Sequence, residues 1–432
     1  MPILSRSGML RSLRQRGLIA TNVLILSELA GAMFKGAKET GRKILFKLQS
    51  GLQPERFLKP VVDYFGRTRP LRGKALLIYR TLPFHLAPDH PVFNFHQSMI
   101  QSRLIGGALD RLGFSLDVVD YSRSKVPRDC LYDIVVCHNG EEDPSAAQYK
   151  DALKIYLASG TEHRAHNDRQ KLRLEAFETR MGHHNIELQW DTENMPWTEQ
   201  SDAIFCFGNE KVADSWRERF RCPVYPFQNT ALKQLNDIQR SWRSPSNHFL
   251  FLGSRQQLAK GLDLLLEAFA DGGDLHLHVC GHYLRDRGFC RAYAKQLFHT
   301  PNIHSHGWVD VTSRRFMKIA AQCSFTISAT CAEGSPGSIT NAMRLGMIPI
   351  VSPEAGLDAG SGVIILNDLS IGGIRSMVRD CAWRSAEELA GLSHAAVQRA
   401  KVDFTEAAFG ERWFQMLSTV LGGTNYQASR DR

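Results

Sequence analysis

Short apolar runs that alternate with helical patterns constrain the fold of this chain more than any other feature of its sequence. Strands with one wet face alternate strictly between apolar and polar residues, and these runs do not. Near-continuous apolar strands are instead typical of a parallel sheet covered by helices on both faces. In the first half of the chain we expect a helix from about Asn94 to Leu112, and strands at residues 74–80, 114–121, 132–140, 154–160 and 202–208.

The pattern begins again after a polar, turn-rich segment around residues 230–245. The second series has expected strands at 248–253, 275–281, 324–330 and 347–353, with helices at 260–270 and 337–345. A chain of 432 residues is also too long for one core. The predicted fold class is therefore α/β, with two Rossmann-like doubly wound domains at residues 75–235 and 236–400. Helices in 401–432 are expected to pack back on the N-terminal domain.

The positive charge of the chain is concentrated at its N-terminus. The net charge is +9, yet residues 1–74 alone hold 15 basic and 4 acidic residues, so the remainder is slightly acidic. The apolar stretch 18–34 is short for a membrane span and contains Glu28. We expect a basic helical extension in 1–74 that contacts an anionic membrane surface. A packing extension and a signal peptide cleaved after Ala30-Gly31-Ala32 remain alternatives.

The cysteines and the lack of an aromatic pattern limit the expected compartment and the expected partners of the protein. The nine cysteines form no Cys-x-x-Cys pair, which argues against a zinc ribbon or a disulfide framework. We therefore predict a cytoplasmic protein, peripheral on the inner face of the membrane. The basic extension lacks interleaved aromatic residues, so nucleic acid is not an expected partner.

The most informative segment for chemistry is CAEGSPGSITNAMRLG, residues 331–346. A strand is expected to end just before it, and a glycine-rich turn leads into a helix. The free N–H groups at the start of that helix, at Gly337, Ser338 and Ile339, suit a diphosphate. Glu333 could accept hydrogen bonds from sugar hydroxyls, and the amide of Asn341 could bind a ribose. A plain strand–turn–helix with a solvated glutamate is the alternative.

A second segment, FLGSRQQLAKGLDLLLEAF, adds two cations at the same expected sheet edge. Arg255 and Lys260 follow a strand and precede a helix, where they could stabilise a departing nucleoside diphosphate. A solvated basic loop is the alternative interpretation.

These two segments together resemble the donor site of the family 4 glycosyltransferases, which have the GT-B fold and retain the anomeric configuration. The resemblance rests on three motifs: the Lys-Gly helix start at Lys260, the Glu333-Gly334 motif and the AMRLGMIPIV run, residues 342–351. The stretch NIHSHGWVD, residues 302–310, is also similar to the family. The resemblance is strong over about residues 248–355 and weak over 75–230. It does not extend to residues 1–74. It implies a C-terminal donor domain and an N-terminal acceptor domain.

Two positions depart from the family pattern. Asn341 stands where the family has a second glutamate that binds the donor ribose, and the loop before Lys260 is one residue longer, which affects the match of Arg255. An inactive GT-B binding or scaffold protein is therefore one alternative to a transferase, and a sugar-nucleotide epimerase is a second.

The acceptor side is expected in the N-terminal domain. His163 lies in a Thr-x-His element that resembles one in the family and would sit near the donor sugar. His138 ends another predicted strand, and Asn94 precedes the first long helix. Catalytic roles are thus predicted for Glu333, His163 and Lys260, and acceptor contacts for His138 and Asn94.

No metal or resident cofactor is predicted. His276 and His278 share one face of a strand, and His282 is near, but no carboxylate or cysteine completes a set at a recognised spacing. Asp-x-Asp, phosphate-loop and dinucleotide-binding glycine motifs are all lacking from the sequence. The predicted function is retaining transfer of a hexosyl unit from a nucleotide diphosphate sugar, as co-substrate, to a hydroxyl of a lipid-linked or surface-polysaccharide glycan.

Overall fold

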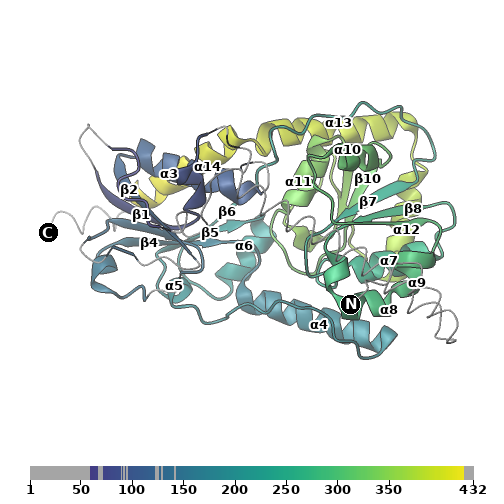
Figure 1. Cartoon of the computed structure of the whole chain (residues 1–432), viewed down its shortest axis with the longest axis horizontal. Helices are drawn as coiled ribbons and strands as arrows, with labels where there is room; N and C mark the ends of the chain where they lie inside the picture. Colours follow the sequence, from purple (N-terminus) through teal and green to yellow (C-terminus); the bar gives the residue numbers. More distant parts are fainter. Residues whose placement is uncertain are drawn as a thin grey trace, which may run out of the picture.

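A computed structural model describes residues 59–66, 72–88, 90, 93, 96–121, 126, 127, 130–140 and 143–422. The expected basic helix with its membrane contact, and Asn94, lie outside these residues. Within the described ranges, no helix has both the length and the apolar character that a bilayer span requires. Two α/β domains lie side by side (Figure 1), as the apolar runs predicted.

The N-terminal sheet has six parallel strands in the order β2-β1-β3-β4-β5-β6. Their central residues are buried on both faces, which explains the lack of alternation in the sequence. Strand β6 was not predicted, because it has four residues and one of them is Pro226. The strands are β1 Gly73–Tyr79, β2 Phe114–Asp120, β3 Ile134–Cys137, β4 Leu153–Ala158, β5 Ala203–Phe207 and β6 Val224–Phe227.

The C-terminal sheet also has six parallel strands, in the order β12-β11-β10-β7-β8-β9. The sequence analysis missed β9, because its alternating histidines and serine make it polar, and the two-residue β12. The strands are β7 His248–Leu252, β8 His276–Cys280, β9 Ile303–Gly307, β10 Phe325–Ser328, β11 Ile348–Val351 and β12 Ile364–Ile365.

Helices cover both faces of each sheet and form separate cores. On the N-terminal sheet, one core includes α3 and α14, and the other α5 and α6. On the C-terminal sheet, one includes α7, α8, α9 and α12, and the opposite face carries α10, α11 and α13. The bounds are α3 Gln97–Arg111, α5 Pro196–Glu199, α6 Glu210–Arg217, α7 Leu262–Ala270, α8 Arg287–Ala292, α9 Ala294–His299, α10 Arg314–Ala320, α11 Gly337–Arg344, α12 Ile371–Ala382, α13 Ala386–Asp403 and α14 Glu406–Gly422.

The last two helices belong to different domains. Helix α13 packs against α11 in the C-terminal domain, whereas α14 crosses back and packs against α3 (Figure 1). The crossing is fixed by aromatic side chains: Trp413 is fully buried, and its ring lies 5.1 Å from that of Phe205. The C-terminal helix therefore completes the core of the N-terminal domain.

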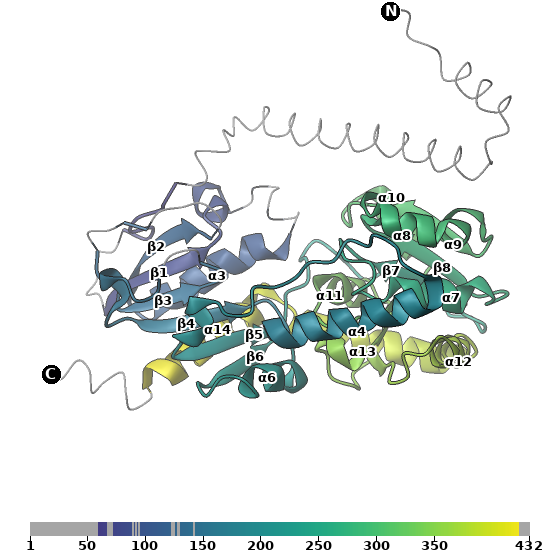
Figure 2. The same cartoon turned by 90° about the horizontal axis from the view of Figure 1, so that it is seen from below.

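Helix α4, His163–Met181, begins at the end of β4 and then runs along the C-terminal domain (Figure 2). The sequence analysis placed no helix here. Phe177 is fully buried in the core of the C-terminal domain. Arg180 donates to Asp263 at 2.7 Å and to Glu267 at 3.2 Å, both on α7. Helix α4 thus begins in the N-terminal domain and packs into the core of the C-terminal domain.

The segment that follows α4 returns along the same path. The backbone N–H of Glu187 donates to Asp286 at 2.9 Å, and Gly288 lies so close to Asn185 that a Cβ there would overlap its carbonyl oxygen. Asn167 on α4 then donates to the Asp191 carbonyl at 3.0 Å. We call residues 163–195 the strap, because they connect the two domains a second time, in addition to the linker after β6.

We predict that Phe177→Ala lowers the free energy of unfolding by about 3–5 kcal/mol, since it leaves a cavity where α4 enters the other domain's core. Leu172→Ala on the same helix is the matched control, because that side chain is 64% exposed, and we expect a change within about 0.5 kcal/mol. Urea unfolding followed by circular dichroism measures both. Equal effects would show that the strap does not contribute to the C-terminal core.

Candidate active site

A cleft of about 390 Å³ lies between the two domains, at the carboxyl ends of the strands. This is the edge at which open parallel sheets bind ligands. Both domains contribute to its walls, among them Tyr79, Gln97 and Phe207 from the N-terminal domain and Leu252, Trp308 and Asn341 from the C-terminal domain.

The floor of the cleft is a direct contact between the domains at Gly334. A Cβ at Gly334 would overlap the carbonyl oxygen of Phe207, and Gly160 packs on the same loop. The hydroxyl of Thr161 donates to the carbonyl of Glu333 at 3.0 Å. Glycine is therefore required here for close backbone approach, and the Glu333 loop is held from both domains.

Lys260 and Glu333 form an ion pair in the cleft, with 2.5 Å between Nζ and Oε1. Both side chains are mostly buried, at 16% and 23% exposure. The backbone after Lys260 requires glycine at position 261. Gly261 has a φ of +75°, and a Cβ there would overlap the Ala329 carbonyl. The structure thus brings together two of the three residues predicted to be catalytic.

Helix α11 begins at Gly337 and points its N-terminus into the cleft, which Gly337 and Ser338 line. Ile339 is different, because its side chain is buried in the core, so only its backbone N–H could reach a ligand. The amide of Gln97, from the N-terminal domain, donates to the Gly337 carbonyl at 3.2 Å. The predicted phosphate site is therefore covered from across the cleft.

Asn341 lies in the cleft with its amide orientation fixed. Its Oδ1 accepts the backbone N–H of Leu232 at 2.8 Å, which identifies the oxygen because the partner can only donate. Its Nδ2 has no hydrogen-bond partner among the described residues and is not one of the buried unpaired atoms. Asn341 consequently offers the cleft a hydrogen-bond donor.

The far end of the cleft is aromatic. The ring of Trp308, which is 39% exposed, lies 5.6 Å from that of His282 at an interplanar angle of 15°. Val309 and Leu252 line the cleft beside it. The sequence analysis did not single out Trp308, although it follows a strand in the NIHSHGWVD stretch.

Arg255 is not brought into the cleft. Its side chain is 58% exposed and its guanidinium lies 3.8 Å from Glu187 on the strap. The neighbouring Gln256 donates to Gln189 at 2.9 Å. This loop thus contacts the strap, and the donor role of Arg255 remains a prediction.

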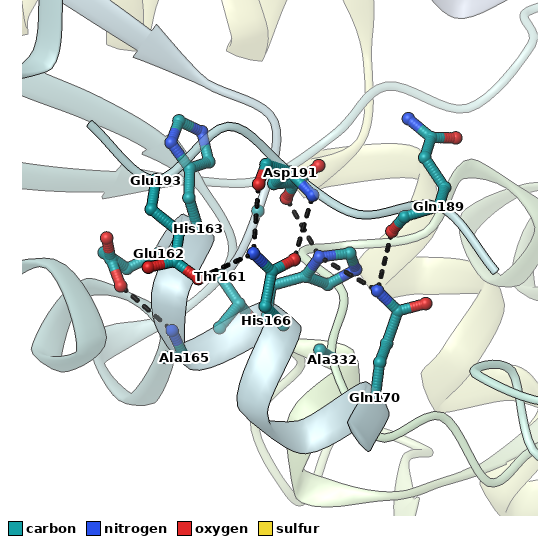
Figure 3. A network of polar contacts seen from close by, with 12 residues as sticks. Thr161, Glu162, His163, Ala165, His166, Gln170, Gln189, Asp191, Glu193 and Ala332 are labelled. Atoms are coloured by element: carbon teal, nitrogen blue, oxygen red, sulfur yellow. Dashed lines mark hydrogen bonds and ion pairs between the residues drawn. The ribbon is translucent and has the colours of Figure 1, made fainter. Parts of the chain in front are cut away.

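His163 is buried at the start of α4, directly after Thr161 and Glu162 (Figure 3). Its Nε2 lies 3.2 Å from the hydroxyl of Tyr156, and its Nδ1 is buried without a partner. Burial lowers the pKa of His163, while the carboxylate of Asp191 opposes this shift. The ring is not among the residues that line the cleft, whereas Thr161, two residues before it, contacts the Glu333 backbone.

His138 lies behind Tyr79, with their ring centroids 5.2 Å apart, and does not line the cleft either. Its Nδ1 is 2.8 Å from the carbonyl of Leu157, which makes Nδ1 the protonated nitrogen. Burial lowers the pKa of His138 to about 4, so the ring is neutral near pH 7. From the N-terminal domain, the cleft is lined instead by Tyr79, His96 and Gln97, none of which the sequence analysis named.

Residues 234–359, which contain Lys260, Glu333 and Asn341, match the family model of the glycosyl transferases group 1. This match lies within the C-terminal half of the chain. No curated protein matches the sequence.

Solved structures with TM-scores above 0.5 show that the chain has the GT-B fold. Sucrose-phosphate synthase from Thermosynechococcus elongatus is 14% identical, over 82% of this chain and 100% of that chain, with a TM-score of 0.54. HepE from Anabaena, in complex with UDP and glucose, is 12% identical, over 81% and 100%, with a TM-score of 0.51. TarM from S. aureus is 12% identical with a TM-score of 0.45, and the match spans 66% of this chain but only 55% of the TarM chain.

We predict that Gly334→Ala destabilises the protein by about 1–3 kcal/mol, because the added methyl group must separate the domains at Phe207. Gly391→Ala is the control: no atom lies within 4 Å of the added Cβ in α13, and alanine in a helix should stabilise it by up to about 1 kcal/mol. Thermal and urea unfolding measure the difference. A Gly334→Ala protein as stable as Gly391→Ala would contradict the close contact.

Proposed function

We propose that this protein is a retaining glycosyltransferase that moves a hexosyl unit from a nucleotide diphosphate sugar to a hydroxyl group. The observation that carries the proposal is the Lys260–Glu333 ion pair beside the N-terminus of α11, inside the interdomain cleft and within the group 1 domain. Cation, carboxylate and free N–H groups in one cleft are the set that a sugar diphosphate requires.

Donor binding exchanges the partners of this ion pair. The diphosphate takes the Lys260 ammonium and the N–H groups at Gly337 and Ser338, and Glu333 is released to accept hydrogen bonds from sugar hydroxyls. Each charged group keeps a polar partner in the cleft, which matters because a buried charge without any partner is costly. Gln97 must move away from Gly337 at the same step.

Catalysis is then a matter of positioning and charge stabilisation. Lys260 and the α11 dipole stabilise the negative charge that develops on the leaving diphosphate. The acceptor hydroxyl attacks from the face that the phosphate leaves, and a phosphate oxygen takes its proton, so the configuration is retained. The donor acts as co-substrate, and the proposal requires no resident cofactor.

The aromatic end of the cleft suits the nucleobase. Trp308 presents a partly exposed ring above the Leu252–Val309 side, and base–aromatic stacking supplies about 1–3 kcal/mol. HepE, which has the same fold, was solved with UDP and glucose, which supports a nucleotide sugar as the donor.

The acceptor enters from the N-terminal domain, at Tyr79, His96 and Gln97. We infer a glycan acceptor, lipid-linked or part of a surface polysaccharide, met by a cytoplasmic enzyme at the inner face of the membrane. The motivating feature is the basic N-terminal extension, with 15 basic and 4 acidic residues in 1–74.

Calorimetric titration with UDP, GDP, ADP and dTDP and their sugars tests the donor site. We expect one nucleotide to bind, and Lys260→Ala to lower turnover of its sugar more than tenfold, about 1.4 kcal/mol in transition-state stabilisation. Lys401→Ala, an exposed lysine on α13, is the charge-matched control. Unchanged turnover in Lys260→Ala would contradict the catalytic role proposed for Lys260. Nucleotide binding without turnover in the native protein would favour the alternative of an inactive GT-B protein.

Asn341→Asp tests whether the side-chain amide of Asn341 donates a hydrogen bond to the ribose of the donor. Aspartate keeps the acceptor for Leu232 N–H but replaces the cleft-facing amide by a carboxylate oxygen near the diphosphate. We expect donor affinity to fall at least about tenfold, or about 1.4 kcal/mol, with the melting temperature preserved. Asn236→Asp, at an exposed position in the linker after β6, is the control. Equal affinity in both variants would remove Asn341 from the donor site.

A further inference from the structure

Arg173, in the middle of the strap, reaches with its guanidinium into the C-terminal domain. It belongs to α4, and its side chain is only 9% exposed. Its Nη2 donates to the carbonyl of Ala329 at 3.1 Å, and its Nη1 lies 3.7 Å from Oδ1 of Asp263, an ion pair without a hydrogen bond. One side chain on α4 thus contacts two separate segments of the C-terminal domain.

Those two segments carry the ion pair of the proposed active site. Asp263 is in the first turn of α7, three residues after Lys260. Ala329 directly follows β10 and comes four residues before Glu333. A guanidinium that contacts both Asp263 and the Ala329 carbonyl therefore acts on the chain close to each of the two charged residues.

The backbones of the two segments are also joined to each other. The N–H of Cys331 donates to the carbonyl of Ala259 at 2.9 Å. Gly261 packs so closely on the carbonyl of Ala329 that a Cβ there would overlap it. The relative position of the two segments is therefore sensitive to any change that moves the Ala329 carbonyl.

A second arginine of α4 shares the carboxylate but not the carbonyl. Asp263 is fully buried, and Arg180 also donates to it, at 2.7 Å. Arg180 is 25% exposed, and its Nη1 donates to the Ala176 carbonyl of its own helix at 3.0 Å. Of these two arginines, Arg173 is the one that also bonds the Ala329 carbonyl.

The chain from β4 into α4 holds the Glu333 segment at two points. Thr161 donates to the carbonyl of Glu333 at 3.0 Å, and Arg173 donates to that of Ala329. Because this part of the chain begins in the N-terminal domain, it connects the proposed donor site to the domain that is proposed to bind the acceptor.

We propose that Arg173 is a positioning residue of the glycosyl transfer, which holds the Lys260 and Glu333 segments in the relative placement that the donor requires. The inference rests on the proposed function, and Arg173 itself is not among the residues that line the cleft. Arginine suits this role because its planar fork can bond a carbonyl and face a carboxylate at the same time. Lysine keeps the charge but has a single nitrogen in place of the fork.

Hydrogen–deuterium exchange of the nucleotide-free protein tests the positioning without catalysis. The reporter is the peptide that contains the Cys331 amide, which is bonded to Ala259. We expect its exchange to be at least about tenfold faster in Arg173→Lys than in the native protein. Arg180→Lys, which alters the same Asp263 ion pairing, is the matched control and should exchange as the native protein does. Native exchange in Arg173→Lys, or equally fast exchange in both variants, would overturn the proposal.

A double variant replaces Arg173→Lys if that protein does not fold. Arg173→Met combined with Asp263→Asn removes both buried charges at once, which is far less costly than the loss of one partner. The asparagine keeps an oxygen that can accept from Arg180. We expect the same fast exchange of the Cys331 peptide, and native exchange in this variant would overturn the proposal.

Kinetics with the nucleotide sugar that the binding screen selects test the link to catalysis. We expect Arg173→Lys to lower kcat/KM at least about tenfold. The further loss in a Lys260→Ala background should be smaller, because Arg173 acts in part through Lys260. Equal losses in both backgrounds would contradict positioning of Lys260. A native protein without turnover would contradict the proposed transfer, and the exchange measurement would still decide whether Arg173 positions the two segments.

Discussion

The ion pair between Lys260 and Glu333 is the interaction on which the site depends. Its two charges come from different loops of one sheet, and the Glu333 loop is in turn held by Thr161 and Gly160 of the other domain. The two mostly buried charged groups are stable only while each keeps a polar partner. A sugar diphosphate satisfies this condition, because it offers an anion to the lysine and hydroxyl groups to the glutamate.

The interdomain contacts decide where that pair sits. The chain crosses between the domains at the linker after β6, along the strap and again between α13 and α14. Buried side chains anchor two of these crossings, Phe177 in the strap and Trp413 in α14. Side chains from opposite domains, such as Gln97 and the Gly337 backbone it contacts, are thereby placed within hydrogen-bond distance of each other.

Much of this arrangement follows from local sequence. Apolar runs identify the central strands because burial on both faces removes alternation, and Lys260 and Glu333 follow strand ends of one sheet. The strap could not be predicted, because α4 divides its buried residues between two domains and carries no single apolar stripe. The positions of Trp308 and Gln97 in the cleft depend on strand register and on how the domains are placed, which no local pattern encodes.

The most direct test of the account is a crystal structure with the nucleotide sugar that the binding screen selects. The account predicts that Lys260 Nζ leaves Glu333 and lies within hydrogen-bond distance of a phosphate oxygen, with the Glu333 carboxylate on a sugar hydroxyl. A donor bound elsewhere, with the Lys260–Glu333 pair intact at its present 2.5 Å, would contradict it.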